Sequence, residues 1–264
     1  MRVAVAQLPA MRDSTDKVFT TDNAVIMLDA TTADVPAAVP ADAYADRLGR
    51  ALRDALNAAP DDDLHDILAD AIGRTATDLR LTPGQSPSSA VSIVRETDDR
   101  LDVLVLGGNT VVLPDEVITD DRLTALDLAA DRTYRERLAA GAGYDDEHRA
   151  LLAELHTQQA ERRNRDDGFW IAEADPGAAE HAVHSSRSLV DARWAVLATT
   201  GAYETLYHLG LDDWRNLLEA DPTELNTLLH DCETWEAHAD PDAAELPRAE
   251  RHADKSIAVV SFAR

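Results

Sequence analysis

The spacing of apolar residues along the chain predicts a series of short strands. Residues 24–28 (Ala-Val-Ile-Met-Leu) form an unbroken apolar run between polar neighbours, which is typical of a buried strand. Three β-branched runs separated by turn sequences predict an antiparallel meander at 90–95, 101–106 and 111–113. Further strands are expected at 169–172, 194–199 and 257–262, with weak alternation at 1–5. The apolar run at 257–262 indicates a central strand.

Amphipathic patterns between these runs predict helices. Apolar residues recur every four positions from Tyr44 to Leu56, so a helix is expected there that ends near Pro60. A second helix is expected from about residue 62, because the carboxylates of Asp61–Asp63 suit the positive end of a helix dipole. Other helical patterns cover residues 120–140, 146–164, 178–184, 214–218 and 225–235.

The order of these elements indicates the fold class. Strands and helices do not alternate strictly, which argues against a doubly wound parallel sheet and favours a layered α+β fold. No internal repeat and no long linker divides the sequence, so residues 1–264 are expected to form a single domain.

The charge of the chain excludes two classes of partner. Its 264 residues include 50 Asp and Glu against 25 Lys and Arg, a formal net charge of -25, with lysine only at positions 17 and 255. Nucleic acids and anionic membranes attract clustered basic residues, so neither is an expected partner. The acidic residues are spread along the whole chain, and both a salty cytoplasm and a GC-rich genome would account for this acidic, lysine-poor composition.

The sequence gives no sign of export or of a membrane anchor. No run approaches the roughly 20 apolar residues of a membrane span, and residues 1–10 lack the basic start and long apolar core of a signal peptide. Cys232 is the only cysteine, so no intrachain disulfide can form. We therefore expect a cytoplasmic protein.

The common enzyme signatures are missing from the sequence. It contains no Gly-rich phosphate loop, CxxC pair, HExxH helix or Gly-x-Ser-x-Gly elbow. His181 and His184 are three residues apart, but the sequence offers no obvious third ligand that would complete a metal site with them. His230, Cys232 and His238 do not have the spacing of a recognised metal site. The basic cluster Arg162–Arg165 is expected to end a helix.

Polar or small residues at the ends of the predicted strands are more informative. Five such blocks occur in the order TDNAVIMLDATT (21–32), SPSSAVSIV (86–94), LVLGGN (104–109), LATTGA (197–202) and HADKSIAVV (252–260). In sequence and in order they resemble the motifs of the metal-dependent protein phosphatases of the PPM type (type 2C). The resemblance covers nearly the whole chain and implies a four-layer αββα sandwich, with two antiparallel sheets face to face and helices outside.

The same resemblance implies a set of metal ligands, and the sequence departs from most of them. The Asp-Gly motif is matched by Asp29 and Ala30, so one acid is kept. The Asp of the first motif is matched by Asn23, with Asp22 one place earlier. The other acidic positions are matched by three neutral residues, Gly108, Thr200 and Ala253. Asp254 and Ser256 follow Ala253 in the sequence.

These departures lead to two alternative functions. The chemistry implied by the resemblance needs two Mg²⁺ or Mn²⁺ ions that activate a water, and hard cations need several carboxylates. With only Asp29 kept, we expect a pseudophosphatase without a bound cofactor or an assigned catalytic residue, which regulates or binds a protein partner or a phosphorylated ligand. The alternative is a divergent Mg²⁺- or Mn²⁺-dependent serine/threonine phosphatase that uses Asp29 with Asp22 and Asp254. A purely structural role and the oligomeric state stay open.

Overall fold

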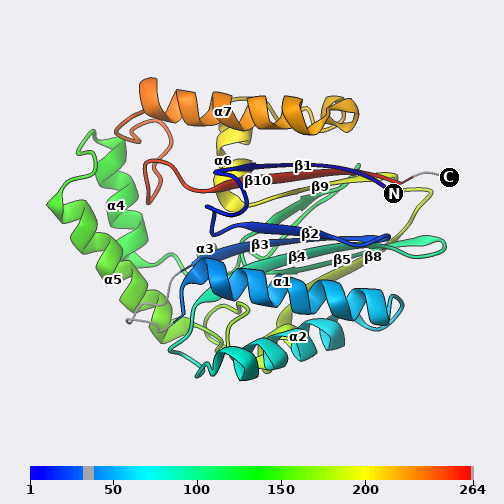
Figure 1. Cartoon of the computed structure of the whole chain (residues 1–264). Helices are drawn as coiled ribbons and strands as arrows, with labels where there is room; N and C mark the ends of the chain where they lie inside the picture. The colour runs from blue at the N-terminus through cyan, green and yellow to red at the C-terminus, as the bar shows by residue number, and fades with distance from the viewer. Residues whose placement is uncertain (32–38, 263–264) are drawn as a thin grey trace.

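The chain folds into two antiparallel β-sheets stacked face to face, with helices on both outer surfaces (Figure 1). A computed structural model describes residues 1–31 and 39–262. Each sheet has five strands, in the orders β1-β10-β9-β6-β7 and β2-β3-β4-β5-β8. The α+β class and the αββα layering expected from the sequence are both confirmed.

The first sheet is built around the C-terminal strand. Its members are β1 (Arg2–Leu8), β6 (Thr110–Val112), β7 (Val117–Thr119), β9 (Trp194–Ala198) and β10 (Lys255–Ser261). β10 pairs with β1 on one side and with β9 on the other. Residues 255–260 are all buried, which confirms the prediction of a central strand here.

The second sheet contains the apolar run at 24–28. Its members are β2 (Lys17–Thr20), β3 (Ala24–Thr31), β4 (Ser88–Glu96), β5 (Arg100–Leu106) and β8 (Val183–Ser188). The run lies in β3, where all five side chains are fully buried. β2 and β8 were not predicted, because β2 is only four residues long and β8 is a polar edge strand.

Two strand predictions are wrong. β4 and β5 form the expected hairpin, but β6 lies in the other sheet, so residues 90–113 are not one meander. The chain crosses between the sheets at Gly107, which has a φ of +82° and whose Cβ would lie 2.9 Å from that of Ala90. The run at 169–172 forms only isolated bridges, Phe169 to Arg163 and Ala172 to Ser89.

The helices cover three sides of the sandwich (Figure 1). α1 (Ala41–Ala58) and α2 (Leu64–Leu79) lie on the second sheet, and α6 (Thr200–His208) and α7 (Pro222–His238) lie on the first. Three helices lie at one end: α3 (Arg122–Ala125), α4 (Ala129–Ala139) and α5 (Asp146–Arg162). Two short 3-10 helices, η1 (Pro176–His181) and η2 (Asn216–Glu219), complete the set within the described ranges.

Local sequence explains several helix boundaries. The Asp63 side chain accepts hydrogen bonds from the backbone of His65 and Asp66, so the acidic triplet caps α2 as predicted. The helical pattern at 120–140 is divided into α3 and α4 at Asp127, which has a φ of 44°. α6 was not predicted. None of the helices in residues 1–31 and 39–262 has the length and hydrophobicity of a membrane span.

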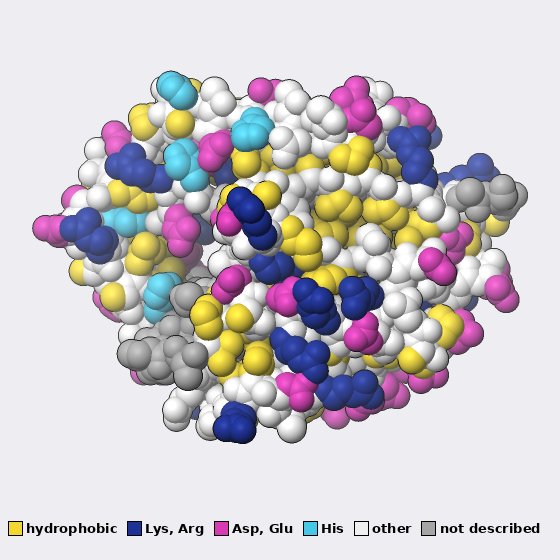
Figure 2. All heavy atoms as spheres, in the orientation of Figure 1, with side chains coloured by type: hydrophobic (Ala, Val, Ile, Leu, Met, Phe, Trp, Pro, Cys, Tyr) yellow, Lys and Arg dark blue, Asp and Glu magenta, His cyan; other side chains and the backbone are white. Residues whose placement is uncertain are grey.

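Charged groups are distributed differently at the surface and in the interior. Figure 2 shows acidic side chains scattered over the visible face between basic and apolar ones. Both lysines are instead buried, with 5% of Lys17 and 1% of Lys255 exposed. Lys17 Nζ donates to the carbonyl oxygens of Met11 and Ser14. The lysines therefore act as internal hydrogen-bond donors.

Gly49 allows α1 to approach β2 and β3 closely. A Cβ at this position would lie 2.8 Å from Leu28 Cδ1 and would overlap the Phe19 ring. Replacing a helical glycine with alanine ordinarily stabilises by about 1 kcal/mol, whereas overpacking a core costs about 1–3 kcal/mol. We expect Gly49→Ala to lower the free energy of unfolding in urea. Gly73→Ala in α2 is the matched control, because its nearest neighbour is Pro176 Cγ at 3.5 Å, and it is expected to be neutral or stabilising.

Candidate active-site cavity

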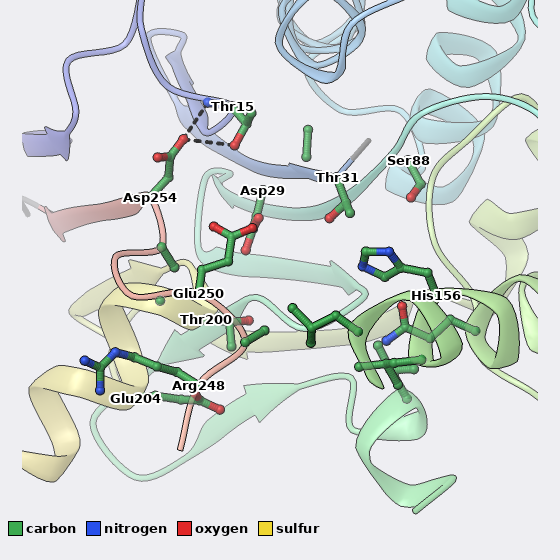
Figure 3. A pocket seen from close by; sticks show the side chains of 18 of the residues that line it. Thr15, Asp29, Thr31, Ser88, His156, Thr200, Glu204, Arg248, Glu250 and Asp254 are labelled. Carbon is green, nitrogen blue, oxygen red and sulfur yellow. Dashed lines mark hydrogen bonds between the residues drawn. The ribbon is translucent and has the colours of Figure 1, made fainter. Parts of the chain in front are cut away.

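A cavity of about 530 Å³ lies at the end of the sandwich that carries α4 and α5 (Figure 3). The end of β3, the start of β4 and the N-terminus of α6 contribute to its walls, together with α5 and the segment that leads into β10. Its polar lining includes Asp29, Thr31, Ser88, Thr200, Glu250 and Asp254. Several of the strand ends singled out in the sequence, at residues 29–31, 88, 200–201 and 253–254, therefore border one cavity.

Asp29 lies near the end of β3 and is only partly exposed. Burial raises the pKa of its carboxyl to about 6, and the nearby charges of Asp254 and Glu250 act in the same direction. A hydrogen bond from the backbone N–H of Thr200, in the first turn of α6, opposes this rise. The Asp29 carboxylate thus binds a helix N-terminus while facing two other acids.

Asp254 is held by the segment that precedes β2. Its Oδ2 atom accepts hydrogen bonds from Ser14 Oγ at 2.9 Å, Thr15 N at 2.7 Å and Thr15 Oγ1 at 2.9 Å. The bonds to Thr15 are drawn in Figure 3. Three donors on one oxygen fix the orientation of this carboxylate.

A third acid, Asp16, lies next to these two and was missed in the sequence. Its side chain is 1% exposed, and its Oδ2 atom accepts a hydrogen bond from Thr199 Oγ1 at 3.0 Å. Its Oδ1 atom has no hydrogen-bond partner among the described residues. Burial raises the pKa of Asp16 well above its usual value, and repulsion from Asp29 and Asp254 adds to the rise. The only sequence signal was the polar group Ser-Thr-Asp before a strand too short to predict.

The positions where the resemblance implies lost acids do come together. Thr200 Oγ1 donates a hydrogen bond to the carbonyl oxygen of Gly108 at 3.0 Å. A Cβ on Gly201 would lie 2.6 Å from the carbonyl oxygen of Asp254 and 3.0 Å from Ala253 Cβ, so glycine permits this close approach. The neutral residues therefore lie around Asp29, and Ala30 and Ala253 also border the cavity.

Asp22 and Asn23 do not belong to this group. They lie in the turn between β2 and β3, at the other end of β3 from Asp29. Six residues of extended chain separate Asn23 from Asp29, a distance of about 20 Å. Asn23 Nδ2 instead donates to the carbonyl oxygen of Glu96 at 3.0 Å. The N-terminal acid that approaches Asp29 is Asp16, and the assignment of Asp22 and Asn23 to the site is corrected accordingly.

The overall arrangement is that of known serine/threonine phosphatases. The chain is similar over its whole length to the PPM Ser-Thr phosphatase MsPP from Mycobacterium smegmatis in complex with cacodylate, with a TM-score of 0.56, 14% identity and 99% of that chain covered. It is also similar over its whole length to the serine/threonine phosphatase Stp1 from Staphylococcus aureus, with a TM-score of 0.58, 9% identity and 96% of that chain covered.

A third similar structure is the catalytic domain of the serine threonine protein phosphatase PstP in complex with two manganese ions. Its TM-score is 0.51 at 13% identity, with 98% of this chain and 97% of that chain covered. The chain is a divergent member of the PPM-type fold. No protein-family model and no curated protein sequence matches it, so the likeness to these phosphatases is one of fold.

Within this PPM-type fold, the donor set does not fit a dinuclear metal centre. Among residues 1–31 and 39–262, no three His, Cys, Asp or Glu side chains form a group that could hold a metal ion. Oδ2 of Asp254 is already bound by three protein donors, and Asp29 accepts from the backbone of Thr200. Mg²⁺ and Mn²⁺ prefer several oxygen ligands, of which carboxylates offset the charge.

The histidines and the cysteine considered in the sequence do not line this cavity. His181 stacks on Trp170 at 3.5 Å, whereas the His184 ring contacts that of His65 at 5.3 Å, so the pair is separated. Cys232 is buried in α7, and burial raises the pKa of its thiol to about 12. His230 and His238 are exposed on the same helix. Arg162 ends α5, as the basic cluster predicted, and forms an ion pair with Asp167.

Proposed function

We propose that this PPM-type fold acts as a pseudophosphatase, a regulatory or binding scaffold that keeps the cavity of the phosphatases without their metal chemistry. One observation carries the proposal: Asp29 and Asp254 accept hydrogen bonds from the protein itself, and no third ligand joins them into a metal-binding group among the described residues. Thr200, Gly108 and Ala253 supply no carboxylate at the neighbouring positions.

Electrostatics support the same conclusion for hydrolysis. A bound divalent ion lowers the pKa of a water and offsets the negative charge of a phosphoryl group. Without it, Asp29, Glu250 and Asp254 place negative charge at the cavity wall. Two like charges 4 Å apart repel by about 4 kcal/mol at an effective dielectric constant near 20. A phosphorylated substrate would meet this repulsion with no cation to compensate for it.

The approach of Asp16 to Asp29 and Asp254 favours the alternative, a divergent metal-dependent phosphatase. These acids are close enough to raise the pKa of Asp16 and Asp29, and a divalent cation would relieve that repulsion. The alternative now depends on Asp16, because Asp22 lies at the far end of β3.

Calorimetric titration with Mn²⁺, together with turnover of p-nitrophenyl phosphate, separates the two functions. For the unaltered protein we expect no saturable Mn²⁺ binding at the cavity and no Mn²⁺-dependent turnover. Thr200→Asp is expected to create Mn²⁺ binding, because it adds a further carboxylate close to Asp29, at a position where the related motif has an acid.

Asp29→Ala and Asp22→Ala form a matched pair of controls, since both replace an acid at an end of β3. Mn²⁺-dependent turnover that is lost in Asp29→Ala and kept in Asp22→Ala would exclude the pseudophosphatase and establish the alternative. The absence of both Mn²⁺ binding and Mn²⁺-dependent turnover would exclude the metal-dependent phosphatase.

A further inference from the structure

We infer that the cavity binds a cationic side chain of a protein partner, a guanidinium or ammonium group on an aliphatic stem. The inference rests on the proposed function, because a metal ion at Asp29 would occupy the same carboxylates. The sequence left two classes of ligand open, a protein partner and a phosphorylated ligand, and the inference favours the protein partner.

Acidic side chains converge on one part of the cavity from separate elements. Asp29 comes from β3, and Glu250 and Asp254 come from the segment before β10. Figure 3 shows the carboxylates of Asp29 and Glu250 next to each other in the cavity. Glu204 of α6 adds a further carboxylate to the lining. The group brings like charges together, and a cation bound beside Asp29 and Glu250 would be stabilised by both.

Two of the three arginines that line the cavity, Arg135 and Arg248, form ion pairs with acids outside the group around Asp29. Arg248 is nearly buried, and its Nη1 atom lies 2.8 Å from Asp240 Oδ2. Arg135 forms an ion pair with Asp131 at 3.0 Å and donates to the carbonyl oxygen of Pro247. Their charges are therefore largely offset locally. Arg135 also interacts with Glu204, whereas no arginine within residues 1–31 and 39–262 contributes to the pKa of Asp29.

Asp16 lies beside this acidic group without lining the cavity. It is 1% exposed and lies beside Asp29 and Asp254, yet its Oδ1 atom has no donor within the part of the chain that the structure describes. Buried polar atoms are nearly always hydrogen-bonded in folded proteins. The unsatisfied acceptor shows that the surroundings of Asp29 and Asp254 are short of hydrogen-bond donors.

The remaining walls suit the aliphatic part of such a ligand. Leu152 and Leu155 of α5 line the same cavity as Phe169 and Ile171. Lysine and arginine bury their methylene stems against apolar surface while the charged end reaches polar groups. The volume of about 530 Å³ lies within the range of roughly 300–1,000 Å³ that is common for ligand sites. The net charge of -25 would also accelerate the approach of a basic segment.

Fluorescence anisotropy with two labelled peptides tests the inference. One peptide carries a single arginine between alanines, and the other carries citrulline, which has the same shape without the charge. In buffer with EDTA, we expect the arginine peptide to bind at least tenfold more tightly than the citrulline peptide. A third peptide, with phosphoserine in place of arginine, is expected not to bind.

Variants locate the binding site. The double variant Asp29→Asn, Glu250→Gln should weaken binding of the arginine peptide at least tenfold, whereas Asp22→Asn should leave it unchanged. Circular dichroism checks that each variant is folded. Equal affinity for arginine and citrulline, or preference for phosphoserine, would overturn the inference. The experiment measures no turnover and contains no free metal, so its result is independent of the Mn²⁺ test of the proposed function.

Discussion

Lys255→Met is expected to lower the free energy of unfolding by about 3–5 kcal/mol, because it leaves a buried carboxylate without its cation. Lys255 Nζ lies 2.8 Å from Glu236 Oε1, and each side chain is 1% exposed. Thr205 and His252 also contact this carboxylate, but neither carries a permanent charge. Urea unfolding monitored by circular dichroism measures the loss.

A double variant distinguishes the loss of charge pairing from the loss of packing. Adding Glu236→Leu removes the buried charge, and replacing a whole buried ion pair with apolar residues is often neutral. The double variant should therefore recover most of the lost stability. Arg50→Met, which removes the exposed ion pair with Asp46, should cost less than about 1 kcal/mol. A double variant as unstable as the single one would contradict this account.

Asp29→Asn is expected to stabilise the metal-free protein at neutral pH. The carboxyl has a pKa of about 6 in the folded protein against 3.8 ordinarily. Between these values the unfolded chain loses the proton while the folded chain keeps it, so stability falls as the pH rises. The resulting penalty reaches up to about 3 kcal/mol above pH 6, at about 1.4 kcal/mol for each pKa unit. Neutral asparagine removes it and can still accept from Thr200.

Thermal unfolding at several pH values in EDTA measures this effect. We expect the melting temperature of Asp29→Asn to exceed that of the unaltered protein by several degrees at pH 7.5. The difference should shrink towards zero near pH 3, below the ordinary pKa of 3.8, where both states carry the proton. Asp22→Asn is the control and should show no such pH dependence. A constant difference at all pH values would show that the charge of Asp29 is not its cause.

The layers of the fold were predictable because they depend on apolar runs that are buried on both faces. The strands β3 and β10 contain such runs, and both were found in the sequence. β8 was missed because an edge strand can be polar, and its sequence is Val-His-Ser-Ser-Arg-Ser. The position of β6 in the other sheet was also missed, because it depends on the turn at Gly107 and on long-range pairing with β9.

The site was predictable only in part. Motif resemblance identified Asp29, Thr200 and Gly108, which the structure brings together. It matched the acid of the first motif to Asn23, seven positions after Asp16, because β2 is too short to be recognised as a strand from the sequence. Hydrogen bonds such as those from Ser14 and Thr15 to Asp254 join residues that are 240 and 239 positions apart, and no local pattern encodes them.

The burial of both lysines restricts how this protein can be regulated. Lys17 and Lys255 are the only lysines in the sequence, and both lie inside the sandwich. Lysine acetylation, lysine methylation and the ubiquitination of lysine all require an accessible ε-amine. The folded protein offers these reactions no accessible acceptor, so lysine modification would mark unfolded chains and leave native ones untouched.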